Sequence, residues 1–290
     1  MRTAASRLHK GFSFERRLAV CESAFEQEGT AWAGSWRFWT PTTSEVEADV
    51  LVKRDVPFER VVLDLGCGKG EYTVACAKRT PTTLFVGIDV DPICVLRSAE
   101  EAVREKVGNA VFIHDPDPDL ARYFGSGELS AILVNFPTPF PKKKRAHLRL
   151  THVDRLMGYR ALLAPGAPLR LRTDSQPFRD FSLTQLALAG YEVKWETDHV
   201  RELFPDEPES AYERKLVAKG APVLGFSAVP GPAPERIEQT APLSLASYLP
   251  DDLDAMTYVP HGMQGTVENM RARNANRRAK GLDACERTNV

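Results

Sequence analysis

Acidic residues follow three successive apolar runs in the middle of the chain, and the first of them precedes a glycine-rich loop. Asp64 stands two residues before Gly66-Cys67-Gly68-Lys69-Gly70, and Asp89 and Asp115 end the next two apolar runs. Glycines at alternate positions let a ligand approach the backbone closely, and carboxylates accept hydrogen bonds from hydroxyl and amino groups. The spacing predicts a nucleoside site in which Asp89 meets a ribose and Asp115 lies near the base.

These residues need an element order that brings the ends of the apolar runs together. Short apolar runs alternate with helix-like stretches, which is the pattern of a parallel sheet with crossover helices. We expect strands at 61–65, 83–90, 110–113, 129–135 and 168–173, with helices at 71–78, 99–105, 152–164 and 182–189. Residues 191–197 and 214–217 are expected to close the sheet as a pair of strands. The expected fold is α/β, with a mostly parallel seven-stranded sheet and helices on both faces.

The chain divides into a central domain and two extensions. Residues 51–222 carry the alternating pattern, whereas residues 1–50 contain one helical stretch and Trp32, Trp36 and Trp39, which we expect in the core. Prolines recur from Pro222 onward, and proline is rare inside sheets. We therefore expect residues 223–290 to form a loosely structured, partly basic extension, with a frayed basic helix at 270–280.

The composition limits the classes of partner. The 290 residues carry a net charge of −1, so an anionic partner must be bound by a local patch. The apolar runs are too short to span a membrane. The five cysteines form no C-x-x-C pair and no zinc-like spacing with histidine. We expect a cytoplasmic protein without a metal site, and its oligomeric state stays open.

A proline-rich loop and a basic run follow the fourth expected strand, where residues 135–150 read NFPTPFPKKKRAHLRL. Proline fixes one backbone dihedral angle, so the loop has little freedom and is expected to hold Thr138 and Phe140 over the reaction site. Phe140 is a candidate for stacking on a flat substrate ring. Five positive charges within eight residues predict contacts with phosphates: Lys142, Lys143, Lys144, Arg145 and Arg149.

The acids behind the glycine loop favour a cationic ligand, because they would repel a pyrophosphate. S-adenosylmethionine carries a sulfonium and an amino group, and Asp64 is placed to interact with that charge. Over about residues 60–175 the pattern resembles the class I (Rossmann-like) S-adenosylmethionine-dependent methyltransferases. The resemblance implies that the cofactor is bound by Asp64, Gly66, Gly68, Asp89 and Asp115.

Three motifs are similar to those of the bacterial tRNA (guanine-N7) methyltransferase family, over roughly residues 58–221. FPTPFPKK at 136–143 resembles the family's FPDPWPKK, Thr173-Asp174 its T-D, and Ser210-Ala211-Tyr212-Glu213 its T-x-Y-E. The resemblance implies a tRNA substrate and places Thr138 and Asp174 at the catalytic position. It assigns binding of the acceptor to Lys142, Asp174, Ser210, Tyr212 and Glu213.

The chain departs from that family at Thr138, where the family has aspartate, and at Phe140, where it has tryptophan. Two basic positions of the family's R-H-x-K-R-R run are also replaced. Methylation of guanine N7 removes no proton, so positioning carries most of the catalysis, but a carboxylate stabilises the charge that the base gains. Three hypotheses stay open: a tRNA (guanine-N7) methyltransferase, a methyltransferase for a small purine-like heterocycle, and a weakened homologue that binds RNA or a protein partner.

Overall fold

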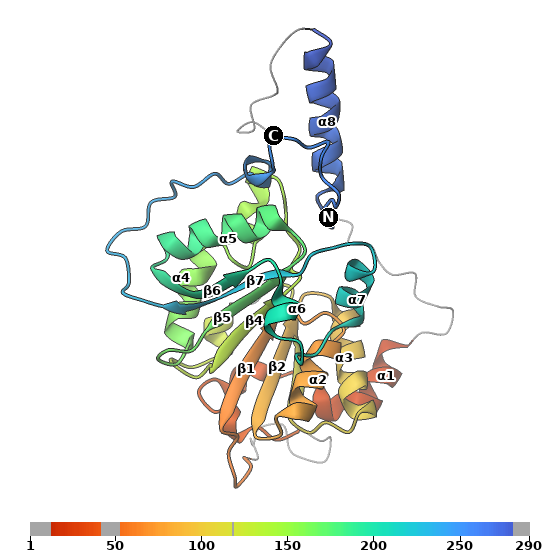
Figure 1. The fold of residues 1–290 in the computed structure, drawn as a ribbon. Coiled ribbons are helices and arrows are strands. Elements are labelled where there is room, and N and C mark those ends of the chain that lie inside the picture. Colours follow the sequence, from red (N-terminus) through yellow and green to blue (C-terminus); the bar gives the residue numbers. More distant parts are fainter. Residues whose placement is uncertain (1–12, 42–52, 118, 281–290) are drawn as a thin grey trace.

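The computed structural model describes residues 13–41, 53–117 and 119–280, and its centre is one seven-stranded sheet with helices on both faces (Figure 1). This arrangement confirms the expected fold class. The strand order is β3-β2-β1-β4-β5-β7-β6. The strands are β1 (Arg60–Leu65), β2 (Thr83–Asp89), β3 (Ala110–His114), β4 (Ala131–Asn135), β5 (Leu169–Thr173), β6 (Tyr191–Thr197) and β7 (Leu224–Pro230).

The first five strands are parallel, and β7 runs antiparallel between β5 and β6. Parallel strands end at the same edge of a sheet, which is where ligands bind in open α/β folds. In the register Asp89 lies opposite His114, and Asp64 lies opposite Gly87 and Leu133. The acidic residues predicted to bind a nucleoside therefore share this edge.

Helices cover the two faces of the sheet in separate groups (Figure 1). Val61, Leu63 and Leu65 of β1 face one core cluster, whereas Val62 faces the other, as the two-residue period of a strand requires. The cluster that includes Val62 is formed with side chains of α1 (Phe14–Cys21), α2 (Glu71–Arg79) and α3 (Pro92–Arg104). The cluster on the other face is formed with side chains of α4 (Val153–Leu162) and α5 (Gln176–Leu188). Two short helices, α6 (Val200–Leu203) and α7 (Ala211–Val217), connect β6 to β7.

The predicted strand at 214–217 is wrong, because these residues belong to α7. The Ser210 side chain accepts the backbone N–H of Glu213 and so caps a helix at this point. The closing strand is β7, which begins beyond the boundary expected at residue 222. Pro222 precedes this strand and Pro230 ends it, so the prolines border the sheet without interrupting it.

The three N-terminal tryptophans are buried, which confirms the expectation that they belong to the core. Trp32 ends the 3-10 helix η2 (Gly29–Trp32). Trp36 begins a second 3-10 helix, η3 (Trp36–Phe38), and Trp39 follows it. The indole N–H groups of Trp32 and Trp39 both donate to the Glu26 carboxylate, at 3.1 and 3.0 Å. The remaining parts of this expected extension, residues 1–12 and 42–50, lie outside the described residues.

The C-terminal segment is more ordered than the sequence predicts. Leu245, Leu249 and Leu253 are buried in the same cluster as α4 and α5. The segment ends in α8 (Gln264–Arg278), which rises above the sheet in Figure 1. Met263, Val267 and Met270, spaced by four and three residues, bury one face of this helix. The expectation of a loosely structured tail with a frayed helix is therefore wrong for residues 223–280, and residues 281–290 lie outside the described part.

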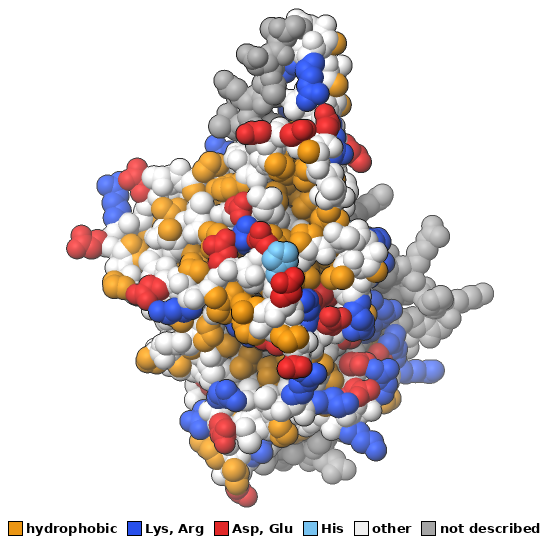
Figure 2. All heavy atoms as spheres, viewed as in Figure 1, with side chains coloured by type: hydrophobic (Ala, Val, Ile, Leu, Met, Phe, Trp, Pro, Cys, Tyr) orange, Lys and Arg blue, Asp and Glu red, His pale blue; other side chains and the backbone are white. Residues whose placement is uncertain are grey.

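Charged side chains of both signs are dispersed over the face seen in Figure 2, as the near-zero net charge suggests. Within the described ranges, no helix is both long and apolar enough to cross a membrane. The same residues contain no group of three His, Cys, Asp or Glu side chains arranged for a metal ion.

Candidate active site

The glycine loop joins β1 to α2 with three residues in the left-handed backbone region. The φ angles of Gly66, Gly68 and Gly70 are 79°, 59° and 72°. A Cβ at Gly70 would lie 2.6 Å from the Ser98 Cβ, so only glycine lets α2 begin this close to α3. A Cβ at Gly68 would meet nothing within 4 Å. The loop therefore has a tightly packed end and an open face that a ligand can approach.

Asp89 ends β2 and connects the glycine loop to the start of α3. Its carboxylate accepts the backbone N–H of Gly68 at 2.8 Å and that of Asp91 at 2.9 Å. Burial raises the pKa of this carboxyl group, whereas these two hydrogen bonds oppose the shift. A carboxylate has about four acceptor positions, so Asp89 keeps capacity for the two hydroxyls of a ribose.

Asp64 is buried at the end of β1, beneath the glycine loop. It accepts the Thr73 hydroxyl of α2 at 2.5 Å and the Asn135 amide of β4 at 3.3 Å. Burial raises its pKa to about 6, and the nearby charge of Asp89 acts in the same direction. A buried carboxylate held by neutral donors is a position that a cation stabilises.

The pH dependence of cofactor binding tests this role of Asp64. Only the ionised carboxylate attracts a cation, so affinity for S-adenosylmethionine is expected to weaken by up to about tenfold for each pH unit below 6. Isothermal titration calorimetry from about pH 5 to about pH 7 measures this slope. The Asp64→Asn variant should bind more weakly at neutral pH and lose most of the slope. An equally steep slope in this variant would assign the titration to another group.

Asp115 follows β3 and is fixed by two local contacts. It accepts the Tyr123 hydroxyl at 2.6 Å and the backbone N–H of Asp117 at 2.9 Å. Together with Asp64 and Asp89 it completes a row of carboxylates at the ends of three neighbouring parallel strands. The open face at Gly68 and the buried carboxylate of Asp64 fit a cationic nucleoside of the S-adenosylmethionine type.

The proline-rich loop after β4 is held in a strained conformation. Phe136 and Phe140 have φ angles of 48° and 44°, in a region that costs non-glycine residues about 1–3 kcal/mol each. Thr138 between them is exposed. The guanidinium of Arg145 lies 4.6 Å from the centre of the Phe140 ring, so this cation covers the ring that was expected to stack on a substrate.

Arg149 does not belong to the exposed basic patch in which the sequence analysis placed it. Its side chain is fully buried and donates hydrogen bonds to the carbonyl groups of Pro139, Phe140 and Pro141, at 2.7 to 3.3 Å. It also donates to the Leu243 carbonyl at 2.8 Å. The loop forms no strand or helix at these residues, and Arg149 supplies donors to their carbonyls; the Pro141 carbonyl also accepts the backbone N–H of Leu245 at 3.0 Å. Lys142, Lys143 and Lys144 remain exposed.

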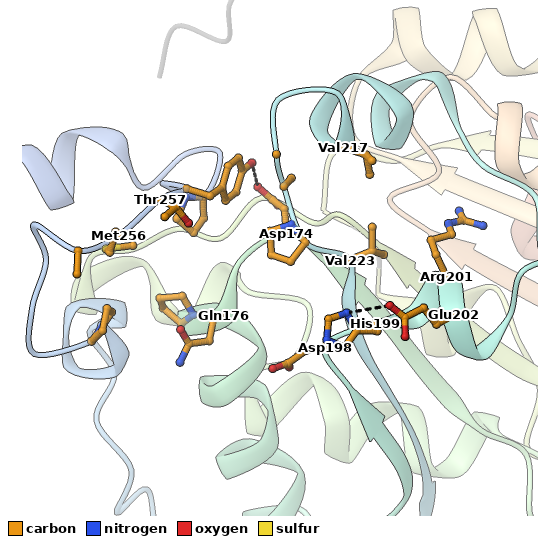
Figure 3. A pocket seen from close by; sticks show the side chains of 18 residues that line it. Asp174, Gln176, Asp198, His199, Arg201, Glu202, Val217, Val223, Met256 and Thr257 are labelled. Atoms are coloured by element: carbon orange, nitrogen blue, oxygen red, sulfur yellow. Dashed lines mark hydrogen bonds and ion pairs between the residues drawn. The ribbon is translucent and has the colours of Figure 1, made fainter.

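Asp174 follows β5 and meets the C-terminal segment. One carboxylate oxygen accepts the Tyr258 hydroxyl at 2.7 Å and the backbone N–H of His261 at 2.8 Å. Residues 256–262, which we call the strap, therefore lie directly against the predicted acceptor-binding side chain. Figure 3 shows Asp174 between the strap, marked by Met256 and Thr257, and Val223 before β7.

A pocket of about 660 Å³ opens beside Asp174. The strap forms one wall, and the start of α5 and the segment around α6 form the others. Asp174, Asp198 and Glu202 bring three carboxylates to its lining, and Arg201 and His199 are the basic groups there. Its size is in the range of ligand pockets, about 300–1,000 Å³.

The predicted acceptor residues on α7 have different surroundings. Ser210 caps the helix. Tyr212 is partly exposed and its hydroxyl lies 3.0 Å from Nδ1 of His261. Glu213 is buried and forms an ion pair with Arg201, so its carboxylate already has a charged partner. Asp174 and Tyr212 thus both contact His261 of the strap, whereas Glu213 is paired with Arg201.

Several residues of this edge were not identified from the sequence. Thr73 and Asn135 donate hydrogen bonds to Asp64. Thr73 comes three residues after the glycine loop and Asn135 ends β4, and these positions in the sequence could have indicated that both side chains lie near Asp64. Tyr258 and His261 contact Asp174 from 84 and 87 residues away, and no local pattern in the sequence indicates this contact.

The seven-stranded sheet with a carboxylate row beside a glycine loop defines the chain as a class I methyltransferase. Residues 59–225 match a family model described as "Putative methyltransferase". A tRNA (guanine-N(7)-)-methyltransferase of Christiangramia forsetii is 34% identical over 176 residues, which cover 59% of this chain and 77% of that protein. The chain therefore belongs to the tRNA (guanine-N7) methyltransferase family, which confirms the resemblance seen in the motifs.

Other relatives carry the same description. The tRNA (guanine-N(7)-)-methyltransferase of Pediococcus pentosaceus is 28% identical over 203 residues, 66% of this chain and 96% of that protein. Among solved structures, the 16S rRNA methyltransferase KamB covers 60% of this chain and 89% of its own, with 19% identity and a TM-score of 0.48. The family match ends at residue 225, so the strap and α8 lie outside it.

Proposed function

We propose that this protein transfers a methyl group from S-adenosylmethionine to N7 of a guanine in tRNA. The observation that carries the proposal is that relatives named for this reaction are 28 and 34% identical to the chain, and the family model matches residues 59–225, which include the glycine loop and the carboxylate row. S-adenosylmethionine, when bound, supplies an electrophilic methyl group. Asp64 and Asp89, with the backbone at Gly66 and Gly68, would hold it, and Asp115 would lie near the base.

The remaining task of the protein is to position the guanine. N7 of guanine has a free lone pair, so the chain needs no general base, and orientation supplies most of the rate. Asp174 offers an acceptor for the N1–H and amino groups of the base. Its buried position strengthens such contacts relative to water. The exposed lysines after the proline-rich loop suit the phosphates of RNA.

A comparison of acceptors tests the proposed function. The full chain is incubated with methyl-labelled S-adenosylmethionine and an unmodified tRNA transcript, with guanosine, or without an acceptor, and the products are identified by nucleoside mass spectrometry. We expect label in 7-methylguanosine of tRNA alone, and its loss when the mapped guanosine is replaced by adenosine. Methylation of guanosine but not tRNA would instead support the small-heterocycle hypothesis, and tRNA binding without methylation would support a weakened homologue.

Thr138 provides a second test of the proposed chemistry. Thr138→Asp restores a carboxylate near the base that gains positive charge, and we expect the rate constant for tRNA methylation to rise by about tenfold or more. Single-turnover kinetics measure this constant directly. Thr138→Asn, which has a similar shape without charge, should stay near the wild-type rate. Equal rates in all three proteins would show that a carboxylate at this position does not contribute.

A further inference from the structure

Two basic segments that are far apart in the sequence form one groove. A pocket of about 340 Å³ lies between the exposed lysines after the proline-rich loop and the side of α8. Lys142, Lys143 and Lys144 line it from one side, and Arg273 lines it from α8. None of the described residues in its lining is acidic. The pocket beside Asp174, in contrast, is lined by three carboxylates, so a polyanion is attracted to the first and repelled by the second.

The groove has a fixed frame. On α8, Thr266, Asn269 and Arg273 are spaced by three and four residues and line the groove, whereas Val267 and Met270 anchor the adjacent side of the helix in the core. The other side of the groove is held by the backbone N–H of Leu245, which donates to the Pro141 carbonyl at 3.0 Å. Buried Arg149 ties the same loop to Leu243. The four cations are therefore exposed side chains on an ordered backbone.

We propose that this basic groove, formed by Lys142, Lys143, Lys144 and Arg273, binds successive phosphates of the RNA acceptor. The proposal rests on the proposed RNA substrate and makes α8 a substrate-binding element outside the residues matched by the family. Arginine pairs with phosphate oxygens through two parallel N–H groups, and lysine acts as a point charge. Neighbouring groups on α8 do not share this role, because Arg271 donates to the Leu253 carbonyl and Arg278 pairs with Asp254.

The salt dependence of tRNA binding tests the groove without any methyl donor. Dissociation constants for an unmodified tRNA transcript are measured for the full chain between about 50 and 200 mM salt. We expect Arg273→Ala to reduce the slope of log affinity against log salt by about 0.7–0.9, the effect of one lost phosphate contact. Lys143→Ala should have the same effect. Arg278→Ala, on the same helix but outside the groove, should keep the wild-type slope.

Two results would overturn the proposal. One is a wild-type slope in both Arg273→Ala and Lys143→Ala. The other is saturable binding of inorganic phosphate alone that tRNA does not displace, which would indicate a small-anion site. The outcome is separate from that of the proposed function: an Arg273-dependent slope without methylation would remove the methyltransferase assignment and keep the groove.

The strap carries an independent inference, because it occupies the hydrogen-bonding edge of Asp174. Two donors, the Tyr258 hydroxyl and the His261 N–H, meet one carboxylate oxygen. Guanine presents two donors of this kind, its N1–H and its amino group. The strap and a guanine therefore cannot both donate to the Asp174 carboxylate in this way at the same time. The strap lies between Leu253 and Met263, which are buried, and Tyr258 and His261 between these anchors are partly or largely exposed.

We infer that the strap is an intramolecular competitor for the acceptor site, which tRNA must displace. This inference also rests on the proposed function. Release breaks the hydrogen bonds of Tyr258 and His261 to Asp174 and loosens the packing of Met256 and Val259 against the core, whereas the anchors at Leu253 and Met263 hold both ends of the segment. Gly262, with φ at 82°, stands between His261 and the second anchor and supplies a point where the backbone can turn.

Hydrogen exchange at the His261 amide reports the displacement directly. We expect exchange at this N–H to become at least about tenfold faster when tRNA binds, because its acceptor is lost. Tyr258→Phe should lower the KM for tRNA by about fivefold or more, since a hydrogen bond to a charged group is removed from the competing strap. Tyr248→Phe is the same change elsewhere in the C-terminal segment; the Tyr248 hydroxyl donates to the Pro242 carbonyl, so this variant should leave the KM unchanged.

Slower exchange at His261 in the tRNA complex, together with a higher KM in Tyr258→Phe, would show that the strap clamps the substrate, and the inference would be wrong. If tRNA is methylated while the His261 amide is protected from exchange, the strap inference fails and the proposed function stands. If tRNA is neither bound nor methylated, the proposed function and the strap inference both fail.

Discussion

Replacing Asp89 with alanine is expected to reduce the affinity for S-adenosylmethionine by at least about 100-fold. A hydrogen bond to a charged group contributes about 1.5–3 kcal/mol, and a carboxylate that receives two ribose hydroxyls makes two such bonds. The same substitution also releases the N–H groups of Gly68 and Asp91, which Asp89 now fixes. Calorimetric titration of the full chain measures the loss.

Asp117→Ala is the matched control for this experiment. Asp117 lies close to the same edge, but its side chain is 84% exposed and pairs only with the surface residue Arg155 in the described contacts. We expect a wild-type dissociation constant for this variant. An Asp89→Ala protein that binds S-adenosylmethionine as tightly as wild type would contradict the assignment of the carboxylate row.

Replacing Arg149 with alanine is expected to destabilise the fold by about 3 kcal/mol or more. The substitution removes the donor that Arg149 supplies to the carbonyls of Pro139, Phe140 and Leu243, and each buried unsatisfied group costs about 1–3 kcal/mol. Burial lowers the pKa of this guanidinium only to about 10, so it stays charged at neutral pH. Urea denaturation of the full chain gives the free energy of unfolding.

Two variants bracket this result. Arg149→Lys keeps the charge but offers fewer, differently arranged donors, so it should recover only part of the stability. Lys144→Ala, in the same basic run but exposed, should stay within about 0.5 kcal/mol of wild type. A loss below about 1 kcal/mol for Arg149→Ala would indicate that water can satisfy the carbonyls of the loop.

The parts of this structure that were predicted from the sequence depend on local patterns. The first five strands and the glycine loop follow from short apolar runs that end in glycine or aspartate, and neighbouring residues determine both. The burial of Arg149 was not predicted, because the run KKKRAHLR does not reveal which cation turns inward. That choice depends on Leu243, 94 residues away.

The C-terminal segment shows the same limit. Pro222 and Pro230 suggested that no strand could form there, but the prolines stand at the two borders of β7 and leave its interior free to pair. The contact of the strap with Asp174 depends on the path of residues 231–257, which contact α5 through Gln239 and Tyr248. Periodicity does predict the buried face of α8, through Met263, Val267 and Met270, once these residues are read at helical spacing.

The position of β7 between β5 and β6 has a consequence for synthesis on the ribosome. β6 is made before β7, yet in the described sheet its only neighbour is β7. A nascent chain that ends at residue 222 therefore presents β5 and β6 as two open edges that a second chain can join. Translation must proceed past Pro230 before those edges are sealed, so recombinant fragments cut at the apparent end of the alternating pattern should aggregate.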